Sequence, residues 1–327
     1  MRNILVAALV VCLASSSWAG ETKRLKFGLE TSRSDSQFHG ATVMADYVKE
    51  KTGGSVEIRL YPDSAFGSTV SVIGQTRSGT VDIYLTGSGN LGGMVESLNA
   101  FDVPFLFRNH AHVDRVMDGP IGRAIMDDCD AFDIKGLALW ENGFRCLTNS
   151  RNAARVPDDV KGLKIRVPGM PMHVKAWELL GANPVPMNYS EVFTALETKT
   201  IDAQDHPIAI TYSSRFYEMQ KYLSVSNHAY TPLLLFMNLK SYNSLTPEER
   251  KIIMEGAHVG AVAQRKFVRD NEAKYIDEME KYGVEVARDI DQGPWKDKIF
   301  GAMVEHVKTT FPKAAAHLEP IEAEGGK

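Results

Sequence analysis

The chain has 327 residues, of which 44% are hydrophobic and 24% are charged. This balance is typical of a globular protein with enough chain for two domains. The formal net charge of −4 gives no electrostatic case for binding nucleic acid, so no nucleic-acid partner is expected.

Residues 1–19 are predicted to be a cleaved export signal. A positive residue, Arg2, precedes an apolar run over residues 4–14, and the small residues Ser17 and Ala19 occupy the positions that a signal peptidase reads. The apolar run is too short to span a bilayer as an anchor. We therefore expect cleavage after Ala19 and a mature protein in the periplasm.

Strand and helix patterns alternate along the mature chain, which predicts an α/β architecture. Period-two alternation and apolar runs predict strands at 24–31, 55–62, 80–87 and 162–169, and one long strand or two at 136–150. Helical patterns lie at 37–54, 171–182, 188–198 and 246–283. No Pro/Gly-rich linker divides the chain. Two domains would therefore be connected by several crossings.

The last of these helices carries the clearest start signal. Thr246 is the expected N-cap, Pro247 follows at the first helical position, and Glu249 stands where a capping box needs it. Gly283 is the residue at which this helix is expected to end. A helix of roughly 50 Å is expected at 1.5 Å per residue, long enough to tie two lobes together. Asn188–Glu191 has the spacing of a second capping box.

A glycine-rich loop follows the strand at 80–87. Gly87, Gly89 and Gly92 match G-x-G-x-x-G, the pattern of a dinucleotide-binding turn. The segment after the loop is too short for the helix that such a turn opens. We therefore favour a glycine turn at a strand end beside a ligand, with Ser88 or Asn90 as the contact. A cofactor loop is the alternative.

No catalytic motif is found elsewhere, so neither an enzyme nor a metal or cofactor site is expected. His110 and His112 are interpreted as solvated loop side chains, because their spacing of two does not suit a zinc site. An oxidising compartment permits a disulfide between Cys129 and Cys146, and two separate buried thiols are the alternative.

Six linked segments carry a distinctive series of motifs. They are FDVPFLF (101–107), ENGFRCLTNS (141–150), VKGLKIRVP (160–168), LGANPVPMNYSEVFTALET (180–198), IDAQDHPI (201–208) and YEMQKYLSVSNHAYTPLLL (217–235). Together they resemble the solute-binding subunits of tripartite ATP-independent periplasmic (TRAP) transporters, the dicarboxylate-binding-protein (DctP) family. FGLETSRSDSQ, ENGFR and AQDHPI look most like the branch that binds 2,3-diketo-L-gulonate.

The resemblance implies a two-lobe α/β periplasmic-binding-protein fold, with the ligand in the cleft between lobes that close on it. The expected division places 20–143 and 232–270 in lobe I, and 144–231 and 271–327 in lobe II. It also implies delivery of an organic acid to membrane permease subunits. Some relatives instead dock on a receptor. We expect a monomer.

The same resemblance implies the ligand-binding residues. Arg166 corresponds to the arginine that holds the ligand carboxylate, and a guanidinium can do this through two parallel hydrogen bonds. Arg145 matches a second arginine of the family. His206 takes the place of a common asparagine and is expected to donate to a ligand oxygen. Tyr189 stands where a ring often lies against the ligand.

Two departures from sialic-acid-binding relatives bear on the ligand. Thr69 replaces a glutamate, and Glu30 replaces an asparagine near the first strand. With Asn90 and His206, these side chains make a pocket rich in partners for hydroxyl groups. An ionised Glu30 would repel a second carboxylate. We therefore expect a sugar acid: a uronate, an aldonate or a diketogulonate. The alternatives are a C4-dicarboxylate or a small 2-hydroxy or 2-oxo acid, and, more remotely, an NAD-dependent oxidoreductase.

Overall fold

The computed structural model describes residues 22–327, so the predicted export signal at residues 1–19 lies outside the described residues. The strands are β1 (Lys23–Gly28), β2 (Val56–Tyr61), β3 (Ile83–Gly87), β4 (Ile134–Asn149), β5 (Lys164–Val167), β6 (Asn183–Pro186), β7 (Ala203–Pro207), β8 (Tyr222–Asn238) and β9 (Glu285–Ala287). The α-helices are α1 (Ser36–Lys51), α2 (Thr69–Ser78), α3 (His110–Met117), α4 (Pro120–Asp127), α5 (Pro171–Leu180), α6 (Val192–Glu197), α7 (Ile208–Ser213), α8 (Leu239–Asn243), α9 (Pro247–Tyr282), α10 (Gly293–Thr310) and α11 (Pro312–Glu324). No helix within this range combines the length and apolar character that crossing a membrane requires.

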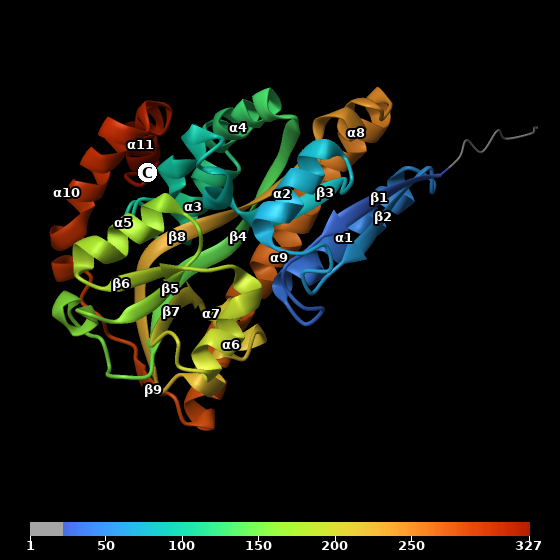
Figure 1. Cartoon of the computed structure of the whole chain (residues 1–327). Coiled ribbons are helices and arrows are strands. Elements are labelled where there is room, and N and C mark those ends of the chain that lie inside the picture. Colours follow the sequence, from blue (N-terminus) through green and yellow to red (C-terminus); the bar gives the residue numbers. More distant parts are fainter. Residues whose placement is uncertain (1–21) are drawn as a thin grey trace, which may run out of the picture.

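The sheet joins two parallel parts through a long antiparallel pair of strands. Its order across the described chain is β2-β1-β3-β8-β4-β7-β5-β6, with β9 beside β8. β1 is parallel to β2 and β3 at one end, and β5 is parallel to β6 and β7 at the other. β4 and β8 are antiparallel to each other and run between the two parts (Figure 1). The fold is therefore α/β and two-lobed, as predicted.

The crossing strands are irregular where they pass between the lobes. The pairing of β4 with β8 shifts between Glu141 and Gly143, and again between Arg145 and Leu147. Such bulges leave a residue unpaired and bend the strand. The segment predicted at 136–150 is thus one bulged strand rather than two. Its bulges re-aim the side chains around Arg145.

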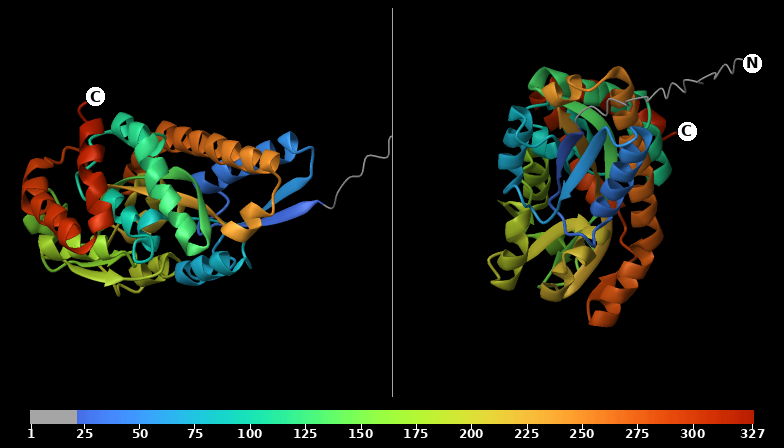
Figure 2. Two further views of the ribbon diagram at one scale, coloured as in Figure 1. Left: turned by 90° about the horizontal axis from the view of Figure 1, so that it is seen from above. Right: turned by 90° about the vertical axis from the view of Figure 1, so that its right-hand side faces the viewer.

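Helix α9 links the two lobes, as predicted. Its 36 residues correspond to about 54 Å at 1.5 Å per residue. The capping box is confirmed: the Thr246 hydroxyl accepts from the Glu249 amide at 3.2 Å, and the Glu249 carboxylate accepts from the Thr246 amide at 2.8 Å. α9 packs on α1 in one lobe and on β4 and α7 toward the other (Figure 2). A Cβ added at Gly40 of α1 would lie 2.9 Å from the Gly260 carbonyl oxygen, so glycine permits this close approach.

3₁₀ turns lie after the glycine loop and at the start of the helix predicted from Asn188. The segment after the glycine loop forms η1 (Ser88–Leu91) and η2 (Glu96–Asp102), and no α-helix opens at the loop. The helix predicted from Asn188 begins with the turn η5 (Tyr189–Glu191) before α6. Its capping box is confirmed, because the Asn188 amide donates to the Glu191 carboxylate at 3.0 Å.

The division of the chain between the lobes stays a prediction. Helix α10 packs against α5, in the predicted second lobe. Helix α11, however, packs against η2, α3 and α4, which fall within residues 20–143. The C-terminal residues 271–327 therefore contact both predicted lobes.

Cys129 and Cys146 are separate, buried thiols, which is one of the two alternatives that the sequence left open. Burial raises the pKa of each thiol to about 12. The interpretation of His110 and His112 as solvated loop residues was wrong, because both belong to α3. His112 is fully buried, and its Nε2 lies 2.7 Å from the Ile321 carbonyl oxygen on α11.

Candidate functional site

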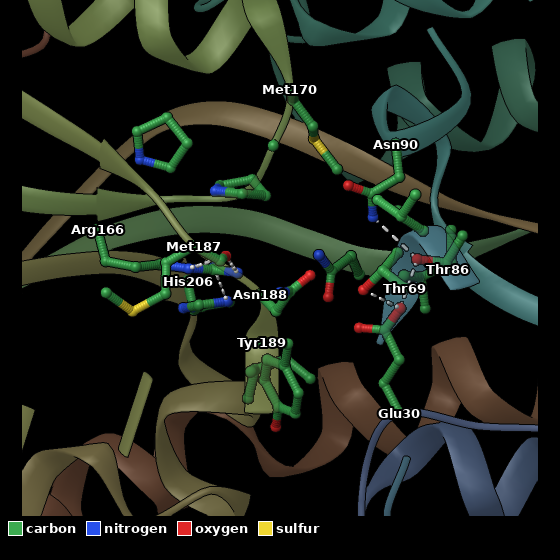
Figure 3. A pocket seen from close by; sticks show the side chains of 18 of the residues that line it. Glu30, Thr69, Thr86, Asn90, Arg166, Met170, Met187, Asn188, Tyr189 and His206 are labelled. Carbon is green, nitrogen blue, oxygen red and sulfur yellow. Dashed lines mark hydrogen bonds between the residues drawn. The ribbon is translucent and has the colours of Figure 1, made fainter. Parts of the chain in front are cut away.

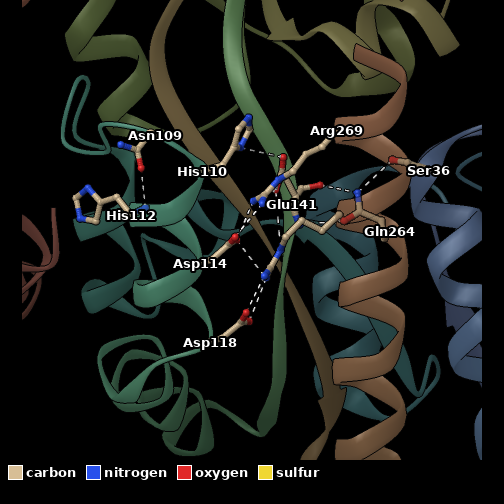
Figure 4. A network of polar contacts seen from close by, with 10 residues as sticks. Ser36, Asn109, His110, His112, Asp114, Asp118, Glu141, Gln264 and Arg269 are labelled. Atoms are coloured by element: carbon tan, nitrogen blue, oxygen red, sulfur yellow. Dashed lines mark hydrogen bonds and ion pairs between the residues drawn. The ribbon is translucent and has the colours of Figure 1, made fainter. Parts of the chain in front are cut away.

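A polar cavity of about 300 Å³ lies between the lobes, within the size range of small-molecule sites. Both lobes and the crossing strands contribute side chains to it (Figure 3). It is lined by Glu30, Gln37, Thr69, Val70, Leu85, Thr86, Gly87, Asn90, Asn142, Arg145, Arg166, Pro168, Gly169, Met170, Pro186, Met187, Asn188, Tyr189, Glu191, His206, Ile210 and Leu233. Six of the seven residues predicted to contact a ligand are among them, and Ser88 is not.

Arg166 is a buried cation at the wall of the cavity. It projects from β5 and is only 3% exposed. Its Nε and Nη2 donate to the Met187 carbonyl oxygen at 3.1 and 2.8 Å, and its Nη1 lies 3.0 Å from Nε2 of His206. A guanidinium has five N–H groups. Three are used here, which leaves one N–H on each terminal nitrogen.

No carboxylate lies within ion-pair distance of Arg166 among residues 22–327. Burial and, to a smaller extent, the nearby charge of Arg145 lower the pKa of its guanidinium to about 10, so the group is still charged at neutral pH. A buried charge without a partner is unfavourable. The site therefore favours an anion, and the two remaining N–H groups suit the two oxygens of a carboxylate.

His206 completes this end of the cavity, but its contacts change the role expected for it. A guanidinium only donates hydrogen bonds, so Nε2 of His206 must accept from Arg166. Nδ1 then carries the hydrogen and donates to the Gln204 side-chain oxygen. In this arrangement neither ring nitrogen is free to donate to a ligand oxygen, contrary to the expectation. His206 instead holds Arg166 in place.

Arg145 also lines the cavity, but its charge is already compensated. It is 1% exposed, and its Nε and Nη2 each lie 3.1 Å from a carboxylate oxygen of Asp205. His228 and Trp177 lie 3.2 and 3.3 Å from the same carboxylate. The Arg145 guanidinium and the hydrogen bond from His228 hold the pKa of Asp205 well below its usual range, against the effect of burial. The two arginines are therefore not equivalent, and ligand contact by Arg145 stays a prediction.

Glu30 and Asn90 lie at the end of the cavity opposite Arg166 (Figure 3). One carboxylate oxygen of Glu30 accepts from the hydroxyls of Tyr84 at 2.5 Å, Thr86 at 2.7 Å and Thr69 at 3.2 Å. Nδ2 of Asn90 lies 2.9 Å from the Thr86 hydroxyl. This end is thus an acidic group surrounded by hydroxyls.

The glycine loop lets the lobes approach each other beside the cavity. A Cβ at Gly87 would lie 2.5 Å from Cε of Met170, and one at Gly89 would lie 2.8 Å from its Sδ. Gly87 and Asn90 line the cavity, as expected of a strand-end turn at the ligand site. Ser88 does not: its hydroxyl is buried and makes no hydrogen bond within the described part of the chain. The alternative of a cofactor-binding loop requires an α-helix directly after the loop, and the chain forms the 3₁₀ turns η1 and η2 there instead.

Tyr189 lies in the wall, with its ring 6.0 Å from the rings of both His206 and Phe216 and its hydroxyl bonded to Ser214. Contact of its ring with a ligand stays a prediction. The sequence analysis missed Gln37 and Asn142, which line the cavity from the start of α1 and from a bulge of β4. The motif containing Asn142 was found, but only the bulge decides which of its side chains faces the cavity.

Folding stability is expected to fall as the pH drops below about 6.5, the unfolded pKa of histidine. Burial and the charge of Arg166 hold the pKa of His206 well below this value, so the folded protein keeps the ring neutral. The unfolded chain then binds a proton that the folded chain does not. The free energy of unfolding therefore falls by up to about 1.4 kcal/mol for each pH unit below about 6.5.

Urea unfolding of the ligand-free protein at pH 7.5 and pH 5.5 tests this expectation. His206→Gln should lose less stability than the wild type between the two conditions. His228, whose pKa is also lowered by burial, contributes equally to both proteins. Equal losses in wild type and variant would contradict the assignment to His206.

Two lobes around a polar cavity, crossed by β4 and β8 and tied by α9, define a solute-binding protein of the two-lobed class. Residues 27–308 match the DctP family, described as "Bacterial extracellular solute-binding protein, family 7". The chain belongs to this family, as its motifs predicted. Proteins of the family are periplasmic, bind small organic acids and work with membrane permease components.

Individual relatives cover nearly the whole chain. It is 39% identical over 323 residues to the 2,3-diketo-L-gulonate-binding periplasmic protein YiaO of Escherichia coli (strain K12), with 98% of each chain covered. A TRAP periplasmic solute-binding protein from Polaromonas sp. JS666, bound to D-erythronate, is 34% identical with a TM-score of 0.88, covering 92% of this chain and 98% of that one. The sugar acid binding protein DctPAm from Advenella mimigardefordensis strain DPN7T, in complex with galactonate, is 30% identical with a TM-score of 0.88, covering 94% and 98%.

Proposed function

We propose that the mature chain, exported and cleaved after Ala19, captures a sugar acid in the periplasm for delivery to the permease of a TRAP transporter. The ligand is a uronate, an aldonate or a diketogulonate. The protein acts as a monomeric binding subunit, without enzymatic activity, metal or cofactor. The observation that carries the proposal is Arg166, a buried guanidinium at the cavity that has no carboxylate partner in the described part of the chain and keeps two N–H groups for one.

The opposite end of the cavity favours a sugar acid over a C4-dicarboxylate. Glu30 lies there, and its charge opposes a second carboxylate on the ligand. A carboxylate does accept hydrogen bonds from hydroxyl groups. The relatives that bind D-erythronate, galactonate and 2,3-diketo-L-gulonate support the same ligand class.

Closure of the lobes accounts for capture. Each lobe supplies one end of the cavity, Glu30 from one and Arg166 from the other, so a ligand that bonds to both ends favours the closed arrangement. Each ligand oxygen removed from water must then find a fixed partner. A ligand lacking a hydroxyl leaves a buried group unpaired, which costs affinity.

A thermal-shift screen of refolded, ligand-free protein tests the proposal. The panel holds uronates, aldonates, diketogulonate, C4-dicarboxylates and 2-oxo acids, with NAD as a control. A ligand at 100 times its Kd adds about 2.7 kcal/mol, which raises the Tm of a chain of this size by a few degrees. Shifts confined to sugar acids are expected. A shift with malate or succinate alone would contradict the ligand class, and one with NAD would contradict the binding-protein assignment.

A further inference from the structure

The hydroxyls around Glu30 have a fixed direction. An oxygen that receives three hydroxyl groups is an acceptor in all three bonds, so Tyr84, Thr86 and Thr69 all donate to Oε1 of Glu30. Tyr84 keeps its proton, since burial and the neighbouring Glu30 raise the pKa of its phenol well above the usual value. The carboxylate is thereby held in one orientation.

The same direction determines how Asn90 faces the cavity. The single hydrogen of the Thr86 hydroxyl is used on Glu30, so its oxygen must accept from Nδ2 of Asn90, 2.9 Å away. The amide oxygen, Oδ1 of Asn90, therefore points away from Thr86. Oε2 of Glu30 is also a free acceptor. Neither Oε2 of Glu30 nor Oδ1 of Asn90 accepts a hydrogen bond from any residue in the range 22–327. Two acceptor oxygens remain at this end, beside the second N–H of the Asn90 amide.

The cavity is thus polarised from end to end. Arg166 offers only donors at one end, while Glu30 and Asn90 offer the two free acceptors at the other (Figure 3). A ligand hydroxyl satisfies such acceptors. A carbonyl or carboxylate oxygen would place acceptor against acceptor and leave buried groups unpaired.

Building on the proposed function, we infer that Tyr84, Thr86 and Thr69 make Glu30 a one-way hydrogen-bond acceptor. This acceptor selects sugar acids whose end remote from the carboxylate carries a hydroxyl, and rejects those that carry a carboxylate or lack the hydroxyl there. Tyr84 is a positioning residue in this scheme. It is 1% exposed, lies behind Glu30 outside the cavity lining, and is held edge-on to Phe236 at 5.8 Å between ring centroids.

Calorimetric titration with three acids of one carbon skeleton tests the inference. The probes are an aldonate such as galactonate, its 6-deoxy analogue and the corresponding aldarate. We expect the wild type to bind the aldonate at least about tenfold more tightly than the 6-deoxy acid, and the aldarate more weakly still. Glu30→Gln offers an amide donor in place of the free acceptor. It should reduce the preference for the aldonate, measured as the ratio of its affinity to that of the aldarate, by at least about tenfold.

Tyr84→Phe separates positioning from simple structural support. It should narrow the same ratio in the same direction, because Glu30 loses one of the bonds that orient it. Tyr61→Phe is the matched control, since Tyr61 packs on Phe66 and makes no hydrogen bond to Glu30. It should leave the ratio unchanged. Near-wild-type Tm values establish that each variant is folded, and Thr86→Val replaces Tyr84→Phe if the latter is not.

The outcomes distinguish the inference from the proposed function. If the aldonate binds and Arg166→Ala weakens that binding by at least about 30-fold, the proposed function stands. Equal affinity of the wild type for aldonate and aldarate would then overturn the inference alone. Ratios unchanged in both Glu30→Gln and Tyr84→Phe would overturn it as well. If the wild type binds none of the three acids, both the inference and the proposed function are contradicted.

Discussion

Replacing Arg166 with alanine is expected to weaken ligand binding by at least about 30-fold while the empty protein stays folded. Among the residues that the structure describes, this guanidinium faces the cavity without a carboxylate partner, and its two remaining N–H groups are the proposed carboxylate clamp. Truncating one partner of a buried, hydrogen-bonded charge pair typically costs about 2–5 kcal/mol. A tenfold change in affinity corresponds to about 1.4 kcal/mol, so the variant should bind the ligand between about 30-fold and several-thousand-fold more weakly than the wild type.

Calorimetry of the variant with the best ligand of the screen measures this loss. The Tm of the ligand-free variant should stay within a few degrees of the wild type, because the substitution removes a buried charge that has no carboxylate within ion-pair distance among residues 22–327. Arg166→Lys is the matched control: it keeps the charge but not the planar fork, so an intermediate affinity is expected. Near-normal affinity of Arg166→Ala would disprove the carboxylate assignment.

Asp205→Ala is expected to have the opposite profile, with a large loss of stability. Its carboxylate compensates Arg145 and accepts from His228 and Trp177 in the interior. Removing it leaves the Arg145 cation buried without a partner. Breaking a buried ion pair in this way typically costs about 3–5 kcal/mol.

Denaturant unfolding of the ligand-free protein provides the measurement. Asp270→Ala is the matched control, because Asp270 forms an exposed ion pair with Lys266 on α9. Exposed pairs contribute about 0–1 kcal/mol, so this variant should unfold close to the wild type. A loss of stability in Asp205→Ala no larger than in Asp270→Ala would mean that Arg145 does not depend on Asp205.

The order of helices and strands was readable from local patterns. Alternating apolar residues in 55–62 and the capping residues around Thr246 act within a few positions of the chain, so their structures follow from nearby residues alone. The 3₁₀ turns after Gly87 and at Tyr189 were missed. Short segments take their conformation from what packs on them, and their own periodicity is too brief to decide it.

Much of the cavity was also anticipated, mostly through the family motifs and, for Asn90, through the expected glycine turn at a strand end. Arg166, His206, Tyr189, Glu30 and Asn90 all line it. The motifs identify positions in the chain. They do not say which atoms of those side chains are already engaged by neighbours, as both ring nitrogens of His206 are. Nor do they say which side chains face the cavity, and Ser88 does not line it.

The distinction between Arg145 and Arg166 shows the limit most clearly. Both are arginines in family motifs, and the sequence alone gives no reason to rank their charges. Asp205 lies 60 positions from Arg145, and the pairing of β4 with β7 brings them together. Similarly, Tyr84 lies 54 positions from Glu30, whose carboxylate it orients. The residue types and local elements are therefore encoded along the chain, whereas the charge state and hydrogen-bond direction of the site depend on contacts between distant segments, which exist only once the sheet has formed and the lobes have met.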